Sequence, residues 1–177
     1  MQRRRFLSGS LALLLWPLAG RAQSPSPARG LAAPVVDALE ASPFVYVSPL
    51  RADGRESTCH GEVWYAWLDG AVVLNTASDT WKSRALSRGL DRARIWVGDH
   101  GTWKRALGGR SEAFRSAPSF EARAERSRDA ALLDRLLARF DQKYPDEIAT
   151  WRDDMRRGFL DGSRFLIRYR PEVEPRT

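Results

Sequence analysis

Residues 44–76, FVYVSPLRADGRESTCHGEVWYAWLDGAVVLNT, decide the fold class of this chain. The stretch holds three runs that are rich in β-branched and aromatic residues, a composition typical of strands: 44–48, 57–67 and 71–76. Asp53-Gly54 and Asp69-Gly70 separate the runs, and Asp-Gly is a strong signal for a tight hairpin turn. The stretch therefore predicts three consecutive antiparallel strands.

Downstream of these strands the hydrophobic pattern changes period twice. Spacings of three and four residues predict helices, whereas alternation predicts strands. The predicted helices cover 81–88, 130–140 and 148–159, and the predicted strands cover 92–98, 102–104, 119–125 and 165–170. Pro145 separates the last two helices. All-antiparallel pairing with a helical pair before the last strand predicts a mainly β fold with α-helices, a small antiparallel barrel with a C-terminal helical pair.

The first 22 residues are predicted to be an export signal. Residues 3–7, RRRFL, resemble the twin-arginine (Tat) motif RR-x-F-L, an uncharged stretch runs from 7 to 20, and a small-x-small pattern ends at Ala22. The uncharged stretch is short and contains Pro17, so no stable membrane anchor is expected. We predict a soluble periplasmic or extracellular protein that passes through the Tat export machinery, which carries folded proteins. An ordinary export signal is the alternative.

The chain divides into four segments: the signal at 1–22, a linker with a short helix at 23–42, the barrel domain at 43–171 and a tail at 172–177. Removing the signal takes away four arginines and no acid, so the formal net charge falls from +7 to +3. Basic and acidic residues are interspersed in the remaining chain, and no nucleic-acid partner is predicted.

The scarcity of cysteine and histidine excludes two kinds of site. Cys59 is the only cysteine, so the chain forms no internal disulfide. His60 and His100 are the only histidines, no metal-ligand spacing occurs, and no metal site is predicted. Because Cys59 lies in a predicted strand, we expect it to be buried, with an exposed lone thiol as the alternative.

The segment 72–84, VVLNTASDTWKSR, concentrates the residues suited to binding a phosphate. A predicted strand ends at Thr76, a short polar loop follows, and Lys82 and Arg84 lie in the first turns of the next helix. Hydroxyl groups, free backbone N–H groups at a helix start and two cations together favour an anion. The alternative is a strand–turn–helix corner without a ligand, and the carboxylate of Asp79, which would repel a phosphate, favours that interpretation.

This order of elements resembles the pyridoxamine 5'-phosphate oxidase-like group of FMN-binding split barrels. The resemblance rests on a strand ending in Thr, a loop, a Ser/Thr-x-Lys helix start, a strand of the Arg-x-Arg-Ile-x-Val type at 92–97, and the Asp-Gly hairpins of 44–76. It covers about 43–125, and the helical pair and closing strand fit the remainder. It implies a six-stranded antiparallel split β-barrel, and a homodimer that holds flavin mononucleotide (FMN) at the subunit interface.

The resemblance also implies the residues that contact the cofactor. Thr76, Thr80 and Lys82 match positions that bind the FMN phosphate. Trp81 stands where the family has an arginine, and Arg84, one helical step on, is a partial replacement. On the second predicted strand, His60, Glu62 and Trp64 share one face, which the resemblance places along the isoalloxazine ring. The full set of candidate cofactor-binding residues is His60, Glu62, Trp64, Thr76, Ser78, Thr80, Trp81, Lys82 and Arg84.

Five tryptophans within 40 residues supply further flat surfaces: Trp64, Trp67, Trp81, Trp96 and Trp103. They could stack on a flat ring and exclude water from it, or pack in the core and dimer interface, and packing is favoured for Trp67. The arginines of the last strand are predicted to form a solvated face: Arg164, Arg168 and Arg170.

The function predicted first is an exported FMN-dependent oxidoreductase with an unknown substrate and no assigned catalytic residue. Pyridoxamine phosphate oxidation itself is not expected, because it belongs to cytoplasmic vitamin metabolism. The alternative is a non-catalytic split-barrel module that binds haem, another tetrapyrrole or deazaflavin, which Trp81 at a phosphate position favours. A structural dimer without a ligand is the third possibility.

Overall fold

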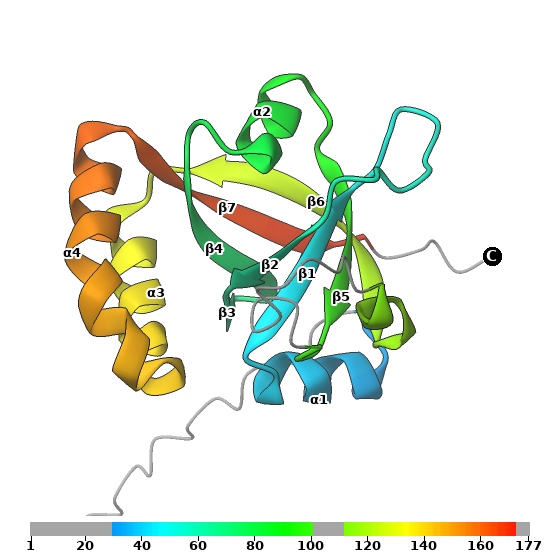
Figure 1. Cartoon of the computed structure of the whole chain (residues 1–177), viewed down its shortest axis with the longest axis horizontal. Coiled ribbons are helices and arrows are strands. Elements are labelled where there is room, and N and C mark those ends of the chain that lie inside the picture. The colour runs from blue at the N-terminus through cyan, green and yellow to red at the C-terminus, as the bar shows by residue number, and fades with distance from the viewer. Residues whose placement is uncertain (1–29, 101–111, 173–177) are drawn as a thin grey trace, which may run out of the picture.

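One antiparallel sheet forms the body of the molecule (Figure 1). The structure, a computed structural model, describes residues 30–100 and 112–172. Its elements are α1 (Ala33–Ala41), β1 (Phe44–Pro49), β2 (Gly61–Trp64), β3 (Ala66–Leu68), β4 (Ala71–Ala77), α2 (Trp81–Ser87), β5 (Arg92–Val97), the 3-10 turn η1 (Ala113–Ser116), β6 (Ser119–Ser127), α3 (Ala130–Lys143), α4 (Pro145–Asp161) and β7 (Arg164–Pro171). The strand order is β2-β1-β5-β6-β7-β4-β3.

The two edge strands of this sheet, β2 and β3, are consecutive in the chain and are separated only by Tyr65. β2 pairs with β1, with Val63 opposite Val45, and β3 pairs with β4, with Ala66 opposite Val73. The two segments therefore act as one bent strand that joins both edges of the sheet. Counted in this way, six strands make a nearly closed antiparallel barrel with a seam, which confirms the predicted split barrel.

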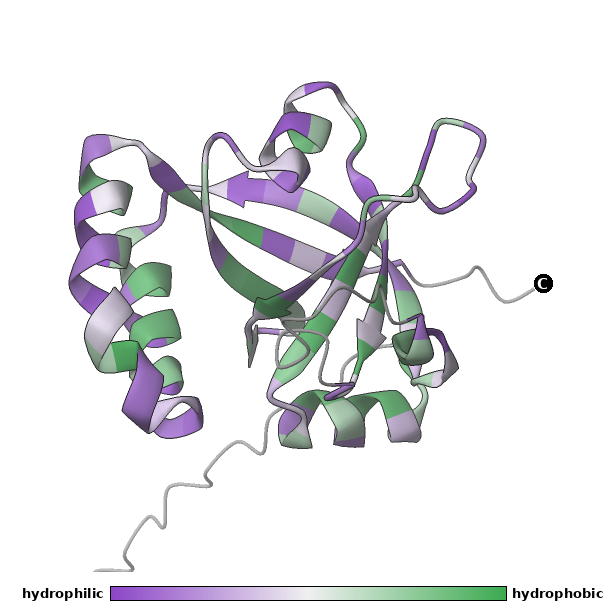
Figure 2. Cartoon of the chain, in the orientation of Figure 1, coloured by the Kyte–Doolittle hydropathy of each residue, from purple (hydrophilic) through white to green (hydrophobic). Residues whose placement is uncertain are grey.

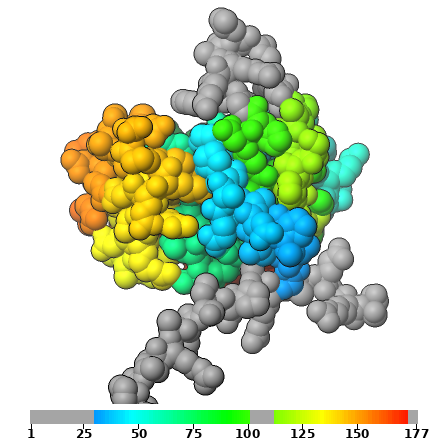
Figure 3. All heavy atoms as spheres, turned by 90° about the horizontal axis from the view of Figure 1, so that it is seen from below, coloured from blue at the N-terminus to red at the C-terminus, as the bar shows by residue number. Residues whose placement is uncertain are grey.

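Alternation along the strands fills the barrel with apolar side chains. On β1, Val45 and Val47 belong to the interior cluster, whereas Tyr46 lies on the outer face opposite Glu62 of β2. α1 covers one end of the barrel, where Leu39 joins the interior cluster (Figures 1 and 3). α2 lies at the other end (Figure 1). Burying each such side chain contributes about 1.5–3 kcal/mol, so the interior is the main source of stability.

The helical pair packs on the outer face of β3 and β4. Leu133, Leu137 and Phe140 of α3 form a second apolar cluster with Ala66 and Val73. Figure 2 shows this division, with hydrophobic residues along β4 and α3 and hydrophilic residues over much of α4. Both predicted helices are confirmed, and each extends beyond its predicted end.

Two residues explain where these helices begin. Asp129 caps α3, because its carboxylate accepts hydrogen bonds from the backbone N–H groups of Ala131 and Leu132 at 2.9 and 3.2 Å. Pro145 ends α3 as predicted and also occupies the first position of α4, where its missing N–H costs nothing. Among the residues described, no helix has the length and apolar character needed to cross a bilayer.

Cys59 is exposed, so the prediction that it is buried was wrong. The ladder explains the difference. Val47 pairs with Gly61, and Leu50 pairs with Glu56. Between these pairs β1 has two residues but the returning segment has four, so the returning segment bulges out of the sheet and carries Cys59 with it. The predicted second strand therefore starts only at Gly61.

Three predictions fall outside the described residues: the export signal at 1–22, the short strand at 102–104 and the position of Trp103. The division into a signal, linker, domain and tail stays a prediction for the same reason. The other predicted strands, at 92–98, 119–125 and 165–170, correspond to β5, β6 and β7.

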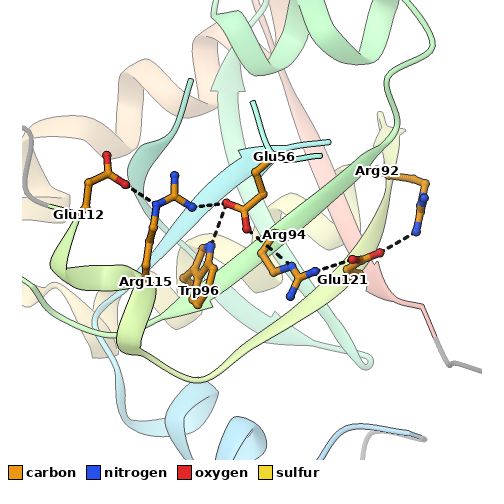
Figure 4. Close-up of polar contacts among 7 residues, drawn as sticks. All are labelled: Glu56, Arg92, Arg94, Trp96, Glu112, Arg115 and Glu121. Carbon is orange, nitrogen blue, oxygen red and sulfur yellow. Dashed lines mark hydrogen bonds and ion pairs between the residues drawn. The ribbon is translucent and has the colours of Figure 1, made fainter. Parts of the chain in front are cut away.

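Ion pairs cross the outer face of β5 and β6 (Figure 4). Glu121 accepts hydrogen bonds from Arg92 and Arg94 at 2.6 and 2.5 Å. Glu56, from the loop after β1, accepts hydrogen bonds from Arg115 and from the indole N–H of Trp96. Figure 4 shows these groups as one continuous chain of alternating charges. Such a network is worth more than isolated surface pairs, because each charge serves several partners.

Replacing Glu56 by glutamine is expected to lower the free energy of unfolding by about 1–2 kcal/mol. Glu56 is only 22% exposed, and its carboxylate lies 3.9 Å from Arg94 Nε, a buried donor with no hydrogen bond within the described part of the chain. Urea unfolding measures the loss. Glu125→Gln is the control, because this carboxylate is 47% exposed and its loss should cost under about 0.5 kcal/mol. Equal losses for the two variants would contradict the prediction.

Candidate functional site

A pocket of about 400 Å³ opens where β2 and β4 diverge. Before the bend at Tyr65, β2 pairs with β1, and after the bend β3 pairs with β4. β2 and the end of β4 at Ala77 are therefore not hydrogen-bonded to each other. Residues of α2, α3 and α4 complete the walls of the pocket. The pocket therefore opens at the seam of the barrel. The volume of the pocket lies within the range of small-molecule sites.

Five of the nine predicted cofactor-binding residues line this pocket: Glu62, Trp64, Thr76, Thr80 and Lys82. They come from β2, from the end of β4 and from the start of α2, which the divergence of the strands brings around one space. The other four lie outside the pocket lining: His60, Ser78, Trp81 and Arg84.

Aromatic and apolar side chains form one wall of the pocket. Trp64 stacks on Tyr144 with ring centroids 4.5 Å apart, and its edge meets Phe140 at 6.0 Å. On α4, Met155 is buried and Trp151 is 46% exposed beside the opening. These fixed rings present a flat apolar surface, which suits an aromatic ligand. The helical pair thus contributes directly to the pocket.

Hydroxyl groups and an ammonium group gather at the α2 end. The hydroxyls of Thr76 and Thr80 lie 3.0 Å apart, and Thr80 also caps α2 by accepting from the N–H of Ser83. Burial lowers the pKa of Lys82. Within the described residues, the Lys82 ammonium has no hydrogen-bond acceptor and no carboxylate partner, only the ring of Trp81 with its centroid 5.1 Å away. A partly buried cation without a counterion is a ready partner for an anion.

Trp81 and Arg84 have other contacts. The Trp81 ring packs over Gly61, where a Cβ atom would lie 3.3 Å from Trp81 Cζ2, so the ring covers the start of β2. Arg84 is exposed and donates a hydrogen bond to the carbonyl of Asp79, just before its helix. Ser78 is exposed as well. Neither the ring nor the Arg84 guanidinium lines the pocket.

Glu62 links the pocket to a buried polar cluster. Its carboxylate accepts a hydrogen bond from the hydroxyl of Tyr46, which in turn accepts from the backbone N–H of His100 at 3.0 Å. His60, predicted to share one strand face with Glu62 and Trp64, lies just before β2 in the bulged segment, and its ring packs against Phe114 with centroids 4.8 Å apart. Of these three residues, Glu62 and Trp64 therefore line the pocket, and His60 belongs to the second cluster.

Sequence reasoning missed Asn75 and placed Arg164 in a solvated face. Both line the pocket, and Arg164 Nη1 donates to Asn75 Oδ1 at 3.2 Å. Asn75 had a usable signal, since it is a polar residue directly after the apolar run Ala71–Leu74 in the same predicted strand. Arg164 had none, because nothing local indicates that α4 and the end of β4 meet the start of β7.

Comparisons with known proteins establish the fold. No family model and no curated protein matches the sequence. The haem storage protein HutZ from Vibrio cholerae has a TM-score of 0.53 at 14% identity, over 81% of this chain and 91% of that chain. The conserved hypothetical protein Rv2991 from Mycobacterium tuberculosis has a TM-score of 0.52 at 19% identity, over 80% and 81%. ChuZ from Campylobacter jejuni has a TM-score of 0.51 at 8% identity, over 78% and 51%. At these identities the likenesses show a shared fold.

Proposed function

We propose that this protein binds FMN in the pocket between β2 and β4 and acts as an exported oxidoreductase. One observation carries the proposal: the Lys82 ammonium, without a counterion among the described residues, lies with the Thr76 and Thr80 hydroxyls around the same space as an aromatic wall. A phosphate fits the first group and a flat ring fits the second. Burial of the phosphate and of the ring would together hold the flavin without a covalent bond.

Haem is the second candidate, and the fold shared with HutZ, a haem storage protein, favours it. Haem iron takes an axial ligand such as histidine, cysteine, methionine or tyrosine. Among the described residues that line the pocket, Met155 is the only one of these types, and His60 is not part of the lining. FMN, which needs no axial ligand, therefore fits this set of residues better.

In an FMN enzyme the redox chemistry belongs to the flavin, and the protein supplies binding, orientation and exclusion of water. Trp64 and Phe140 supply the apolar surface, and Lys82 and the two threonines supply the anchor for the phosphate. Glu62 is held at the pocket by Tyr46 and would orient a donor group of the ring. No residue of this pocket needs to act as an obligatory acid or base.

Replacing Lys82 by alanine is expected to weaken FMN binding by about five- to tenfold, because the phosphate loses a charge-assisted partner. Flavin fluorescence titration measures the affinity. Arg84→Ala is the matched control, since this cation lies two residues further on the same helix but outside the pocket, and it should leave the affinity unchanged. Unchanged FMN affinity in Lys82→Ala would remove the phosphate assignment.

A visible spectrum of the mature protein from its native compartment separates the candidate ligands. Flavin absorbance supports FMN, and a Soret band supports haem. A colourless protein that does not take up added FMN argues against both and favours a barrel without a ligand.

We further propose export by the Tat route and assembly as a homodimer. The motif at residues 3–7 supports export, and replacing both leading arginines by lysine should retain the protein in the cytoplasm. The alternating arginines and glutamates on the outer face of β5 and β6 are complementary to the same face of a second copy and support self-association. Sedimentation velocity measures the oligomeric state.

A further inference from the structure

The pocket contains a second group of donors beside Lys82 and the threonines. Arg164, at the start of β7, uses Nη1 to contact Asn75 Oδ1 at 3.2 Å. This contact fixes the orientation of the amide, so Asn75 Nδ2 points away from the guanidinium. Nδ2 is buried and has no acceptor within the described residues. A buried amide donor without an acceptor is costly unless a ligand satisfies it.

The guanidinium of Arg164 also lacks a charged partner. Across residues 30–100 and 112–172, no carboxylate lies within 4.0 Å of it, although Arg168 and Arg170 on the same strand both pair with Glu125. Its remaining N–H groups are therefore available to the pocket that it lines. Arginine and an amide side by side present several donors to one carbonyl or carboxylate.

Gly158 shows that the position of Arg164 is built into the packing. This glycine is buried in the last turn of α4, although glycine is a poor helix former. A Cβ atom at Gly158 would lie 2.8 Å from both Cγ and Cδ of Arg164. The absent side chain thus leaves room for the stem of Arg164 to pass between α4 and β7. Glycine at position 158 lowers the helix propensity of α4, but its lack of a side chain lets the Arg164 guanidinium reach the pocket.

We propose that Asn75 and Arg164 form a second polar subsite of the pocket, which binds a carbonyl or carboxylate on the ring portion of the ligand. The inference rests on the proposed function, since it assumes that a flat cofactor occupies the pocket. In this arrangement Lys82 binds the phosphate, and the Asn75–Arg164 pair binds hydrogen-bond acceptors of the ring. For a flavin these acceptors are the carbonyl oxygens of the pyrimidine ring.

The test compares FMN with riboflavin, which has the same ring and no phosphate, in titrations of the wild type and of Arg164→Gln. Loss of a charged donor to the ring should weaken both ligands by the same factor, roughly tenfold or more. Lys82→Ala should weaken FMN alone. Arg168→Gln is the matched control on the same strand, because Arg168 does not line the pocket and should change neither affinity.

Gly158→Ala keeps the guanidinium in the protein but displaces its stem. We expect a smaller loss for both flavins, and urea unfolding of the variant shows whether the fold is retained. A loss that affects FMN alone in Arg164→Gln, or no loss for either flavin, would overturn the inference.

If the wild type binds neither flavin, the proposed FMN function fails and the same comparison uses protoporphyrin IX and its dimethyl ester. The subsite then predicts that the diacid binds the wild type more tightly than the ester and that Arg164→Gln removes this advantage. An undiminished advantage in the variant, or no binding of either porphyrin, overturns the inference.

Discussion

Replacing Tyr144 by phenylalanine is expected to lower the free energy of unfolding by about 2–4 kcal/mol, although only one oxygen atom is lost. The Tyr144 hydroxyl accepts a hydrogen bond from the backbone N–H of Tyr65 at 3.1 Å and donates one to the carbonyl of Pro43. Tyr144 is almost fully buried, so water does not replace the lost partner. The buried N–H of Tyr65 and the partly buried carbonyl of Pro43 would each be left without this hydrogen bond, at about 1–3 kcal/mol each.

The size of this effect follows from the place of Tyr65 in the barrel. Tyr65 interrupts β2 and β3, so its own N–H and C=O lie outside both ladders. The carbonyl accepts a hydrogen bond from Lys143 Nζ at 3.3 Å, and the N–H donates to Tyr144. The last residues of α3 thus satisfy the backbone at the bend that creates the seam.

Tyr169→Phe is the control for this prediction. Tyr169 is also buried, but no hydrogen bond to another described residue involves its hydroxyl, so its removal should change the free energy of unfolding by less than about 0.5 kcal/mol. Urea unfolding with an unchanged m value measures both variants. A loss in Tyr144→Phe no larger than that in Tyr169→Phe would show that the bend does not depend on this hydroxyl.

The stability of the wild type is expected to rise between about pH 7 and pH 10, and Lys143→Met is expected to remove most of that rise. Burial, with a smaller contribution from Arg139 and against the opposing effect of Glu40, lowers the pKa of Lys143 to about 7. The unfolded lysine, with a pKa of 10.5, then binds more protons than the folded one across this interval. Stability therefore increases with pH there, and the full penalty of burying the charge is present below pH 7.

The expected rise is about 2–4 kcal/mol, because each pKa unit corresponds to about 1.4 kcal/mol and the ammonium keeps part of its contact with water. Above pH 10 the trend reverses. Burial raises the pKa of Tyr65, Tyr144 and Tyr169, so the unfolded tyrosines ionise first and favour unfolding. Stability should therefore be highest near pH 10.

Urea unfolding at several pH values between 6 and 10 measures the slope. Lys82→Met is recorded alongside, because burial also lowers the pKa of Lys82 and this lysine contributes in the same direction. Lys143→Met should remove the larger part of the rise. The same slope in the wild type and in Lys143→Met would show that Lys143 stays protonated in the folded state throughout the range.

Much of the fold could be predicted from the sequence because its signals are local. Asp69-Gly70 turns β3 into β4 as expected, and Pro145 separates the two helices at the predicted residue. The same local pattern found Thr76, Thr80 and Lys82, which lie within seven residues of one another and meet in the pocket. Short-range spacing fixes their relative positions before any tertiary contact forms.

The rest of the site could not be predicted, because it depends on contacts between distant segments. Asn75 and Arg164 are 89 residues apart, and Tyr65 and Tyr144 are 79 residues apart. The alternation of β7 shows that Arg164 lies on one face, but not that Gly158 of α4 leaves room for it there. Likewise, nothing in 57–67 indicated an interruption at Tyr65.

The sequence by itself determined the types and order of the elements and the apolar face of each strand, since hydrophobic periodicity and turn residues act over a few positions. Only the tertiary structure decided where the sheet opens, which helix covers the opening and which cations reach into it. A strand that must pair with β1 at one end and β4 at the other has to bend between them. That bend at Tyr65, satisfied by the end of α3, creates the pocket.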